Sequence, residues 1–379
     1  MDKINFFPND LDVQNKKIIL RLDLNVPVKE KVIKDYTRID LCLPFIKQLV
    51  QKKAKIIIIS HLGRPKINKD PALSLTPIYK YLKEKLQTNV YFFMGKFDDE
   101  VKDKFSHLKE GEVILIENIR YFKEETEDDD NFSKKLGSLG DIYINDAFSC
   151  SHRKQASVHK ITEYVSLSYA GPLFKREVDA INLVIKNKKE PVTCIIGGSK
   201  ISTKINVITS LIEKINNLII VGAMANNFLV YKNFKVGKSL VENDTKEIIE
   251  KIYKKAKENN CEIMIPEDCM VGTSFEGKGE NKDLDKIQDD EIILDIGANT
   301  IKAIKKKIEL SNTVLWNGPA GYFENENFAN GTRSIATTIS KNTLERSLIS
   351  VLGGGDTLSA INKSKNELSF SHLSTAGGA

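Results

Sequence analysis

The sequence contains no stretch that could span a membrane or direct export. None of its apolar runs reaches the ~18 residues that a membrane-spanning helix requires. The first 25 residues carry charges throughout and have no signal-peptide core. No low-complexity tract is present, and 41% of the 379 residues are hydrophobic, which is typical of folded globular domains. We therefore expect two or three globular domains and no membrane partner.

Cysteine and histidine are scarce, and neither forms a pattern that binds a metal. The cysteines are odd in number and widely separated, which favours a reduced compartment over a disulfide framework. We therefore predict a cytoplasmic protein without a metal bound by cysteine or histidine. The five cysteines are Cys42, Cys150, Cys194, Cys261 and Cys269, and the five histidines are His61, His107, His152, His159 and His372.

A charged stripe of a single sign is also missing. The 57 basic and 51 acidic residues give a net charge of +6. Lysines and acids are interleaved, as in Glu247–Lys254, which is typical of a salt-bridged helix surface. We therefore predict no nucleic-acid partner.

The two most familiar nucleotide-binding motifs are absent. No G-x-G-x-x-G opens a strand–helix–strand unit, which argues against an ordinary dehydrogenase. Gly272–Gly279 nearly matches a P-loop, but Gly279 replaces the required serine or threonine and no helical segment follows. We interpret residues 272–279 as a flexible loop.

Short β-branched runs alternate with helix-sized segments along most of the chain. The runs are apolar on both faces, which is typical of parallel strands covered by helices on each side. We predict α/β architecture, with two doubly wound parallel-sheet domains of three α/β/α layers joined by a hinge helix. The predicted strands are Lys17–Leu22, Lys55–Ile59, Val113–Ile116 and Asp141–Ile144 in the first half, and Val192–Ile196, Leu218–Val221, Glu262–Ile265, Thr313–Trp316 and Leu348–Leu352 in the second.

The boundary between the halves is predicted at Ala170-Gly171-Pro172. The Gly-Pro pair ends one unit, and helical periodicity begins at Leu173 and continues to Ile185. No sequence repeat relates the two halves. The predicted parts are a first domain (1–170), a connecting helix (171–186), a second domain (187–365) and a C-terminal segment (366–379) that returns toward the hinge and the first domain.

Basic and polar residues follow strand after strand in the first half. Open α/β sheets bind ligands beyond the carboxyl ends of their strands, and guanidinium groups bind phosphate and carboxylate oxygens in pairs. For any single arginine a surface salt bridge is the simpler interpretation, whereas the whole set predicts a small, strongly anionic ligand. Arg21 lies inside its strand, and we interpret it as structural and paired with an acid. The set is Arg38, His61, Arg64, Arg120 and Arg153.

Two glycines and a lysine pair follow a strand in the second half. Gly197 and Gly198 end the strand, and Ser199–Lys204 opens a helical pattern that would place Lys200 and Lys204 on one face. The N–H groups of a helix start suit a polyphosphate. An ordinary strand–helix turn with solvated lysines is the alternative interpretation.

Three further glycine-containing junctions follow strands of the same half. Gly353–Thr357 has the glycines of a phosphate nest and an aspartate that can hold Mg²⁺. Gly222–Asn226 and Trp316–Gly321 occupy equivalent places after their strands. One such junction is weak evidence, but the four together predict that the second domain binds a nucleotide.

Taken in order, these motifs resemble phosphoglycerate kinase from near residue 10 to the end of the chain. The resemblance implies a two-domain enzyme of glycolysis and gluconeogenesis. Its Mg²⁺-dependent, reversible phosphoryl transfer between 1,3-bisphosphoglycerate and ADP gives 3-phosphoglycerate and ATP. Direct in-line transfer on domain closure and a monomeric state are also implied. The matching motifs are Arg21-x-Asp-x-Asn-Val-Pro27, His61-Leu-Gly-Arg-Pro65, Asp146-Ala-Phe148 with His152-Arg153, Gly197-Gly-x-Lys200, Trp316-Asn-Gly-Pro319 and Gly354-Gly-Asp-Thr357.

The resemblance assigns 3-phosphoglycerate to the first domain and the Mg-nucleotide to the second. Residues around the transferring phosphoryl group would be Arg38, Lys200, Gly354 and Gly377, with Asp356 near the metal. The implied substrate contacts are Asp23, Asn25, Arg38, His61, Leu62, Gly63, Arg64, Arg120 and Arg153, and the implied nucleotide contacts are Lys204, Glu324, Gly354, Gly355, Asp356 and Thr357.

The chain departs from the family pattern in three places. Thr203 stands where many members carry Asp, and Ala376 replaces the first of three usual glycines. The sequence ends at Ala379, whereas family members usually continue with a segment that packs on the first domain, so we expect weakened stability and closure. The alternative function is a catalytically weak paralogue or truncated form that binds a nucleotide or a protein partner.

Overall fold

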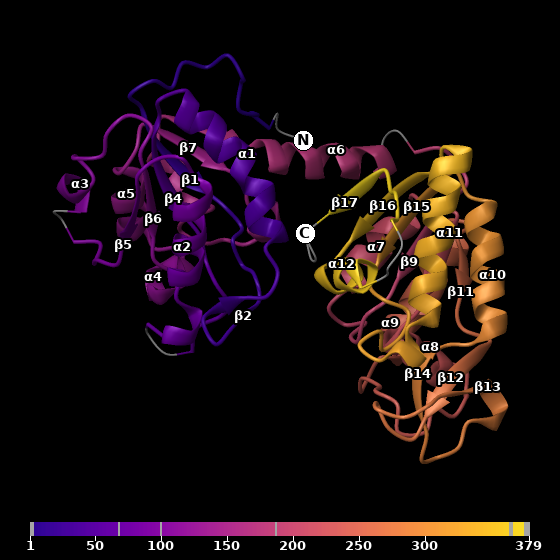
Figure 1. Cartoon of the computed structure of the whole chain (residues 1–379). Coiled ribbons are helices and arrows are strands. Elements are labelled where there is room, and N and C mark those ends of the chain that lie inside the picture. Colours follow the sequence, from indigo (N-terminus) through magenta and orange to yellow (C-terminus); the bar gives the residue numbers. More distant parts are fainter. Residues whose placement is uncertain (1–3, 67–68, 99–100, 186–187, 364–366, 375–379) are drawn as a thin grey trace. The chain divides into compact units, whose positions relative to one another are not determined.

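The computed structural model describes residues 4–66, 69–98, 101–185, 188–363 and 367–374. The chain forms two compact units, and the division between Val178 and Asp179 falls inside helix α6 (Pro172–Ile185). Each unit is built around a parallel sheet, as Figure 1 shows. Within the described residues, no helix combines the length and the hydropathy needed to cross a membrane.

Strands and helices alternate along the first unit, which is the order that produces parallel sheets. Its strands are β1 (Lys17–Arg21), β2 (Val28–Lys29), β3 (Val32–Ile33), β4 (Lys55–Ile59), β5 (Val90–Phe93), β6 (Val113–Ile116), β7 (Ile142–Asn145) and β8 (Leu167–Ala170). Its helices are α1 (Thr37–Gln51), α2 (Thr76–Lys85), α3 (Val101–Lys104), α4 (Lys123–Thr126) and α5 (Asp130–Gly137), with the short 3-10 helices η1 (Pro71–Leu73), η2 (Ile119–Tyr121), η3 (Phe148–Cys150) and η4 (Lys160–Glu163).

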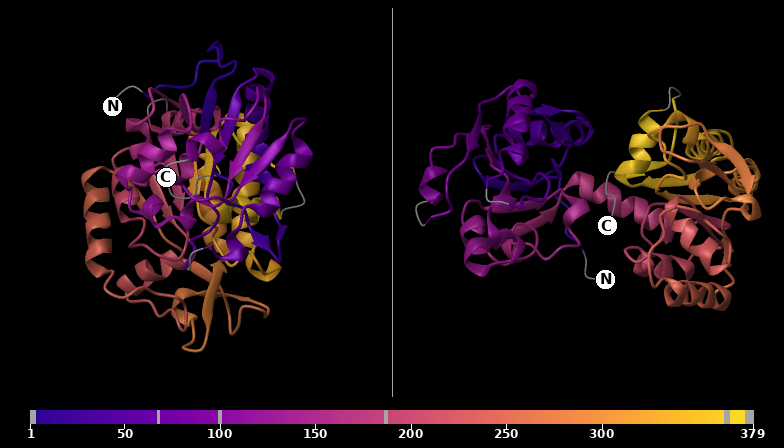
Figure 2. Two further views of the ribbon diagram at one scale, coloured as in Figure 1. Left: turned by 90° about the vertical axis from the view of Figure 1, so that its left-hand side faces the viewer. Right: turned by 90° about the horizontal axis from the view of Figure 1, so that it is seen from below.

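The sheet of the first unit has the strand order β5-β6-β4-β1-β7-β8, and all its pairings are parallel. Successive side chains of a strand face opposite sides of a sheet. Ile18 and Leu20 of β1 therefore pack with α1 and α2, whereas Ile19 packs with α3 and α5. Helices thus cover both faces of the sheet (Figure 2), which explains why its strands are continuous apolar runs.

The second unit repeats this alternation and adds a small antiparallel sheet. Its strands are β9 (Val192–Ile196), β10 (Asn217–Ile220), β11 (Glu262–Met264), β12 (Asp268–Gly272), β13 (Glu280–Asp283), β14 (Ile292–Ile296), β15 (Thr313–Asn317), β16 (Ile349–Gly353) and β17 (His372–Ser374). Its helices are α7 (Ile205–Ile212), α8 (Ala223–Tyr231), α9 (Lys246–Glu258), α10 (Ala298–Glu309), α11 (Asn330–Arg346) and α12 (Gly355–Asn362), with η5 (Leu284–Lys286) and η6 (Glu326–Phe328).

The parallel sheet of the second unit has the order β11-β10-β9-β15-β16-β17, and the antiparallel sheet has the order β13-β12-β14. Ile196 and Ile220 face a core formed with α7, α8 and α9, whereas Ile195 and Trp316 face a core formed with α10, α11 and α12. Helices α10 and α11 lie side by side on that second face (Figure 1). Two parallel sheets with helices on both faces confirm the predicted fold class.

All nine predicted strands are present, each with ends within one residue of the prediction. The sequence analysis missed the edge strands β5, β8 and β17, the antiparallel strands β12, β13 and β14, and the short antiparallel pair β2 and β3. An edge strand meets solvent on one side, so β5 and β8 are less completely buried than the central strands and carry exposed residues such as Tyr91 and Leu167. Strand β17 lies in the predicted C-terminal segment and pairs with β16. Residues 272–279 join β12 to β13 as a loop.

The predicted helical start at residues 199–204 is wrong. Helix α7 begins only at Ile205, and the residues before it form turns. Glu242 accepts hydrogen bonds from the backbone N–H groups of Ile201 and Ser202 and from the Ser202 hydroxyl. This carboxylate holds the segment as a turn, so the two lysines of the segment do not share a helical face.

Helix α6 begins at the predicted Gly-Pro boundary, where a carboxylate from the first sheet meets its first turn. Asp146 follows β7, and its Oδ1 accepts the backbone N–H of Phe174 at 2.8 Å. Burial raises the pKa of Asp146 to about 6, although its hydrogen bonds to the helix backbone oppose that shift. Asp146 therefore ties the start of α6 to the first unit.

Candidate functional site

Each parallel sheet has one place where its strand order reverses. In the first sheet β1 lies between β4 and β7, and in the second sheet β9 lies between β10 and β15. Open α/β sheets bind ligands in the crevice beyond the carboxyl ends of the strands at such a reversal. Topology therefore defines one ligand position on each unit, and the predicted site residues follow these strands.

A hydrogen-bonded group in the first unit joins Asp23, Asn25, Arg38 and Gly63. The Arg38 guanidinium on α1 donates to Asp23 Oδ2 and to the Asn25 carbonyl oxygen, both at 3.0 Å. Asn25 Oδ1 accepts the backbone N–H of Gly63 at 2.8 Å. The residues that follow β1 thus orient the arginine, and the Arg38 side chain remains 24% exposed and accessible to a ligand.

His61 is a buried, neutral imidazole. Burial lowers its pKa well below the ordinary value, and the neighbouring cations, first Arg21 and then Arg120, lower it further. Arg21 Nη2 lies 3.0 Å from His61 Nδ1, and a guanidinium can only donate, so Nδ1 is the acceptor. The imidazole proton is therefore on Nε2, which leaves that nitrogen as a hydrogen-bond donor.

Arg21 is fully buried and serves the interior of the first unit. Its Nε donates to Ser157 Oγ at 3.0 Å, and that hydroxyl donates to Glu125 Oε1 at 2.7 Å. Burial raises the pKa of the Glu125 carboxyl, and Arg21 and Ser157 oppose that rise. The acid predicted for Arg21 is thus Glu125, reached through a serine hydroxyl.

Arg120 carries donors that the described residues leave unpaired. Its Nη1 donates to the Gly63 carbonyl oxygen at 2.7 Å, whereas its buried Nε and Nη2 have no partner in the described part of the chain. Burial, then the nearby cations Arg153 and Arg21, lower the pKa of Arg120 to about 10. Unpaired buried donors on a cation are costly, so this position favours an anion.

Arg120 lines a cavity of about 940 Å³ together with the predicted residues Arg64 and Arg153. Glu124 is the only acid among the described residues of its lining. Gly63 connects this cavity to the group around Arg38, because its carbonyl oxygen accepts from Arg120 and its N–H donates to Asn25 Oδ1. Leu62 is a buried core residue. The remaining basic residues of the cavity are Lys66, Lys69, Lys96 and Lys123.

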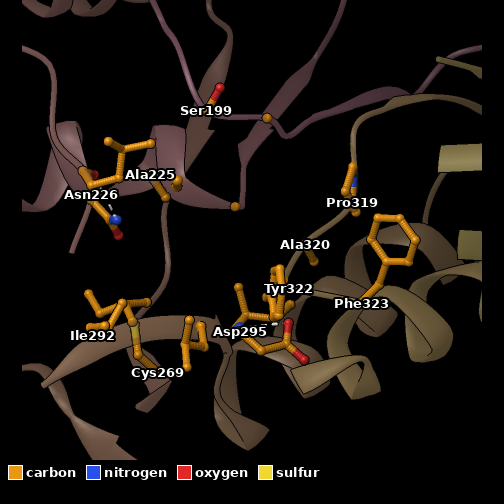
Figure 3. A pocket seen from close by; sticks show the side chains of 18 of the residues that line it. Ser199, Ala225, Asn226, Cys269, Ile292, Asp295, Pro319, Ala320, Tyr322 and Phe323 are labelled. Atoms are coloured by element: carbon orange, nitrogen blue, oxygen red, sulfur yellow. Dashed lines mark hydrogen bonds between the residues drawn. The ribbon is translucent and has the colours of Figure 1, made fainter. Parts of the chain in front are cut away.

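The second unit contains a pocket of about 500 Å³ at the carboxyl ends of β9, β10 and β15 (Figure 3). The backbone after β9 lies very close to the backbone after β15 at this pocket. A Cβ on Gly197 would lie 2.3 Å from the Pro319 carbonyl oxygen, and Gly198, with φ of +117°, occupies a region that L side chains rarely adopt. Glycine is therefore required at this wall of the pocket for steric reasons.

The two predicted lysines have different surroundings. Lys204 is partly buried, and its Nζ donates to the Gly197 carbonyl oxygen at 2.8 Å and to Asn317 Oδ1 at 2.9 Å. Burial lowers the pKa of Lys204. Lys200 is exposed. The Thr203 hydroxyl donates to the Lys200 carbonyl oxygen at 3.0 Å and so closes the turn, a bond that an ionised Asp could not donate.

The glycine run after β16 leads directly into α12. Gly354 is the residue before the helix and has φ of +100°. Thr357 is buried, and its Oγ1 accepts the backbone N–H of Gly318 at 2.8 Å, which joins the loops after β15 and β16. Asp356 is exposed in the first turn and lines the pocket, as does Glu324. Gly355 has open space around its Cα.

The acidic residues of the pocket suit a metal ion that arrives with a ligand. Within the described residues there is no group of three or more His, Cys, Asp or Glu that could hold a metal ion. Mg²⁺ usually keeps several waters and is bound by one or two carboxylates plus substrate phosphates. Asp356, exposed on the pocket lining, therefore fits Mg²⁺ bound together with a nucleotide.

The pocket also contains residues that the sequence analysis did not single out. Asp295 on β14 is buried, accepts the N–H groups of Gly331 at 2.7 Å and Ile296 at 2.9 Å, and has a pKa that burial raises to about 7. Its strand was not predicted, so no sequence signal indicated it. Asn226, the last residue of the Gly222–Asn226 junction, also lines the pocket.

One predicted site residue, Gly377, lies outside the described residues, as does Ala376. The other predicted site residues are described, and they fall into two sets, one on each unit. The substrate set gathers around Arg38 and Arg120, and the nucleotide set gathers around the pocket of the second unit.

Fold and sites together define a class of protein. A cationic cavity on one doubly wound unit, and a glycine-walled pocket with carboxylates on the other, suit a phosphotransferase that handles a small anion and a nucleotide. The sequence profile of the family described as phosphoglycerate kinase matches residues 9–379. The chain therefore belongs to the phosphoglycerate kinase family, and it is an enzyme of the phosphotransferase class.

Individual relatives agree with this assignment. The phosphoglycerate kinase of Wolbachia pipientis wMel is 44% identical over 370 residues, which cover 97% of this chain and 92% of the relative. That of Dictyoglomus turgidum is 42% identical over 372 residues, 98% of this chain and 93% of the relative. The structure of phosphoglycerate kinase from Coxiella burnetii matches with a TM-score of 0.83 at 36% identity, covering 97% of this chain and 93% of that chain.

Proposed function

We propose that this chain transfers a phosphoryl group reversibly between 1,3-bisphosphoglycerate and ADP, giving 3-phosphoglycerate and ATP. The observation that carries the proposal is the pair of buried Arg120 nitrogens that have no partner among the described residues, in a cavity that Arg64 and Arg153 also line. Such donors suit the carboxylate and phosphate oxygens of a small, strongly anionic ligand. Relatives named phosphoglycerate kinase suggest which ligand that is.

On the first unit, the arginines bind the anionic groups of the phosphoglycerate. Arg38 is already oriented by Asp23 and Asn25, so little conformational entropy is lost when it meets the ligand. His61 donates from Nε2 as a neutral group, which adds a hydrogen bond without adding to the positive charge of the site.

On the second unit, the start of α12 receives the nucleotide phosphates. The first N–H groups of this helix have no partner within the helix, and the helix dipole places partial positive charge there. Asp356 would hold Mg²⁺, which would supply neutralisation of the phosphate charge. Lys204 and Glu324 complete the nucleotide contacts from the wall and the rim of the pocket.

The transfer itself needs positioning and charge neutralisation more than covalent chemistry. In this proposal Arg38, Lys200, Gly354 and Gly377 surround the phosphoryl group, and the two cations hold its equatorial oxygens. Because each substrate binds to a different unit, transfer requires the units to close and exclude water. The proposal includes a monomeric, cytoplasmic enzyme.

A coupled assay of ATP formation from 1,3-bisphosphoglycerate and ADP tests the proposal. We expect turnover that disappears when EDTA removes Mg²⁺ and returns when MgCl₂ is added in excess. Calorimetric titration with ADP and with 3-phosphoglycerate, each alone, tests the two half-sites separately. Binding of ADP without any ATP formation would contradict the proposed catalysis and favour a nucleotide-binding relative.

A further inference from the structure

The pocket of the second unit has a phosphate end and a base end. Asp356 follows β16, whereas Ala225 and Asn226 follow β10, and β9 and β15 lie between these two strands in the sheet. The phosphates of a bound nucleotide belong at the start of α12, beside β16. The base therefore belongs at the β10 side of the pocket.

Apolar residues surround that β10 side. Figure 3 shows Asn226 on the same side of the pocket as Ile292 and Cys269, with Pro319 and Phe323 on the opposite side. Leu240 lines the same pocket, and its carbonyl oxygen accepts a hydrogen bond from Asn226 Nδ2 at 3.1 Å. A flat purine ring suits such apolar walls, and the polar groups that meet its edge decide which purine is bound.

The side-chain carboxamide of Asn226 is only partly hydrogen-bonded within the described residues. The side chain is 1% exposed. A backbone carbonyl can only accept, so the atom of the carboxamide that faces Leu240 must be the NH₂ group, and the remaining atom must be Oδ1. Oδ1 is buried and has no hydrogen-bond partner among the described residues.

Asn227, the next residue of α8, provides a comparison, because its hydrogen bonds are those of an asparagine with a structural role. Asn227 Nδ2 donates to the Met224 carbonyl oxygen at 3.2 Å, and its Oδ1 accepts the backbone N–H of Glu242 at 2.9 Å. Both of its polar atoms are therefore paired within the protein. Within the described part of the chain Asn226 pairs only its donor, and it belongs to the pocket lining, so its hydrogen bonds inside the protein do not account for its carboxamide oxygen.

We propose that Asn226 Oδ1 accepts a hydrogen bond from the exocyclic 6-amino group of adenine and thereby determines base specificity. This inference rests on the proposed function, because it requires a nucleotide in this pocket. A site built to hydrogen-bond a substrate group discriminates against an analogue that lacks the group, since its own buried polar atom then stays unpaired. Guanine carries a carbonyl oxygen at the same position of the ring and could not donate this bond.

Calorimetric titration with two nucleotides tests the proposal. ADP is compared with purine riboside 5′-diphosphate, which differs from ADP only by the missing 6-amino group. We expect the unmodified enzyme to bind the analogue about 10-fold more weakly than ADP. In Asn226→Ala and Asn226→Leu the ratio of the two Kd values should fall to about one. Asn206→Ala, an exposed asparagine of α7 that is not part of the pocket lining, should keep the 10-fold ratio.

The possible results separate the two proposals. Equal affinity of the unmodified enzyme for both nucleotides would overturn the role of Asn226 while leaving the nucleotide site in place. Retention of the preference in both Asn226 variants would overturn it as well. This comparison of ligands in the unmodified enzyme remains decisive even if both variants fail to fold. Failure of ADP itself to bind would overturn the proposed nucleotide site, and with it this inference.

Discussion

The two ligand sites of this chain are built from different groups. In the first unit the ligand position is defined by charged side chains, and Arg120 keeps two donors unpaired within the described residues. In the second unit it is defined by backbone, and Gly197 leaves no room for a side chain. A small, multiply charged anion is bound best by charge-assisted hydrogen bonds from cationic side chains. A nucleotide is bound along its length by backbone groups that approach it closely.

The difference extends to how each site holds its own cations. Arg38 is oriented by two hydrogen bonds but stays partly exposed, whereas Lys204 donates to Gly197 and Asn317 and lies largely within the fold. Substitutions in the first site should therefore change ligand affinity, and substitutions of the groups packed into the fold of the second, such as Gly197 and Lys204, should also change stability. The following predictions test that contrast.

The largest effect is expected at the exposed lysine beside the pocket. We expect Lys200→Ala to reduce turnover at least ~100-fold, because in the proposed mechanism this cation contacts the phosphoryl group during transfer. Stability should not change, since this side chain is exposed. Steady-state kinetics with both substrates saturating provide the measurement. Lys235→Ala, which breaks only an exposed ion pair with Asp289, is the control, and near-normal turnover of Lys200→Ala would remove Lys200 from the mechanism.

Arg120→Met should weaken binding of 3-phosphoglycerate about 10- to 100-fold, because two charge-assisted hydrogen bonds to the ligand are lost. The free protein should be no less stable, because the substitution also removes a buried cation with unpaired donors. Calorimetric titration and thermal unfolding of the same sample measure both quantities. Arg333→Met serves as the control. A large loss of stability with unchanged affinity would show that Arg120 is structural.

Gly197→Ala should destabilise the second unit by about 1–3 kcal/mol, because the added methyl group meets the Pro319 carbonyl oxygen at 2.3 Å. Gly355→Ala is the matched control, since nothing lies within 4 Å of a Cβ at that position. Urea unfolding followed by circular dichroism measures the free energy of unfolding of each variant. Equal stability of the two variants would mean that the loop after β9 can move away and does not fix the pocket wall.

The smallest effect concerns pH. The pKa of Asp295 is about 7 in the folded protein, against an ordinary value of 3.8. Between these values the folded state keeps a proton that the unfolded state has released, so stability should fall as pH rises from about 4 to about 7. The slope contributed by this group is at most about 1.4 kcal/mol per pH unit. Asp295→Asn should flatten the pH dependence of the unfolding midpoint, and an unchanged slope would show that Asp295 does not titrate in this range.

The sequence was a good guide to the buried strands and a poor guide to the edges. Strands such as β4 and β9 are apolar on both faces because helices cover both sides of them, so their pattern is unmistakable. Strand β13 consists of Glu280–Asp283 and contains no apolar residue. Its position comes from pairing with β12, and no local pattern could indicate it.

The candidate site was predicted only in part, for a similar reason. Arginines at strand ends could be found by inspection, because parallel strands bring their carboxyl ends to one edge of a sheet. The start of α7 at Ile205 could not be found in this way, because the turn before it is hydrogen-bonded to Glu242, a residue far along the chain that accepts the N–H groups of Ile201 and Ser202. Asp295 and Asn226 are likewise held by hydrogen bonds to residues distant in sequence. Asp295 accepts the N–H of Gly331, and Asn226 donates to the carbonyl oxygen of Leu240.

The sequence by itself thus determined the two doubly wound units, the cationic set of the first and the glycine junctions of the second. These features arise from local periodicity and from residue types that act wherever a strand ends. Tertiary packing was needed to show that Lys204 turns inward, that Arg120 keeps two donors unpaired within the described residues, and that Asn226 differs from Asn227. Burial and hydrogen-bond partners depend on which distant segments pack together, and these contacts decide what each side chain can still offer to a ligand.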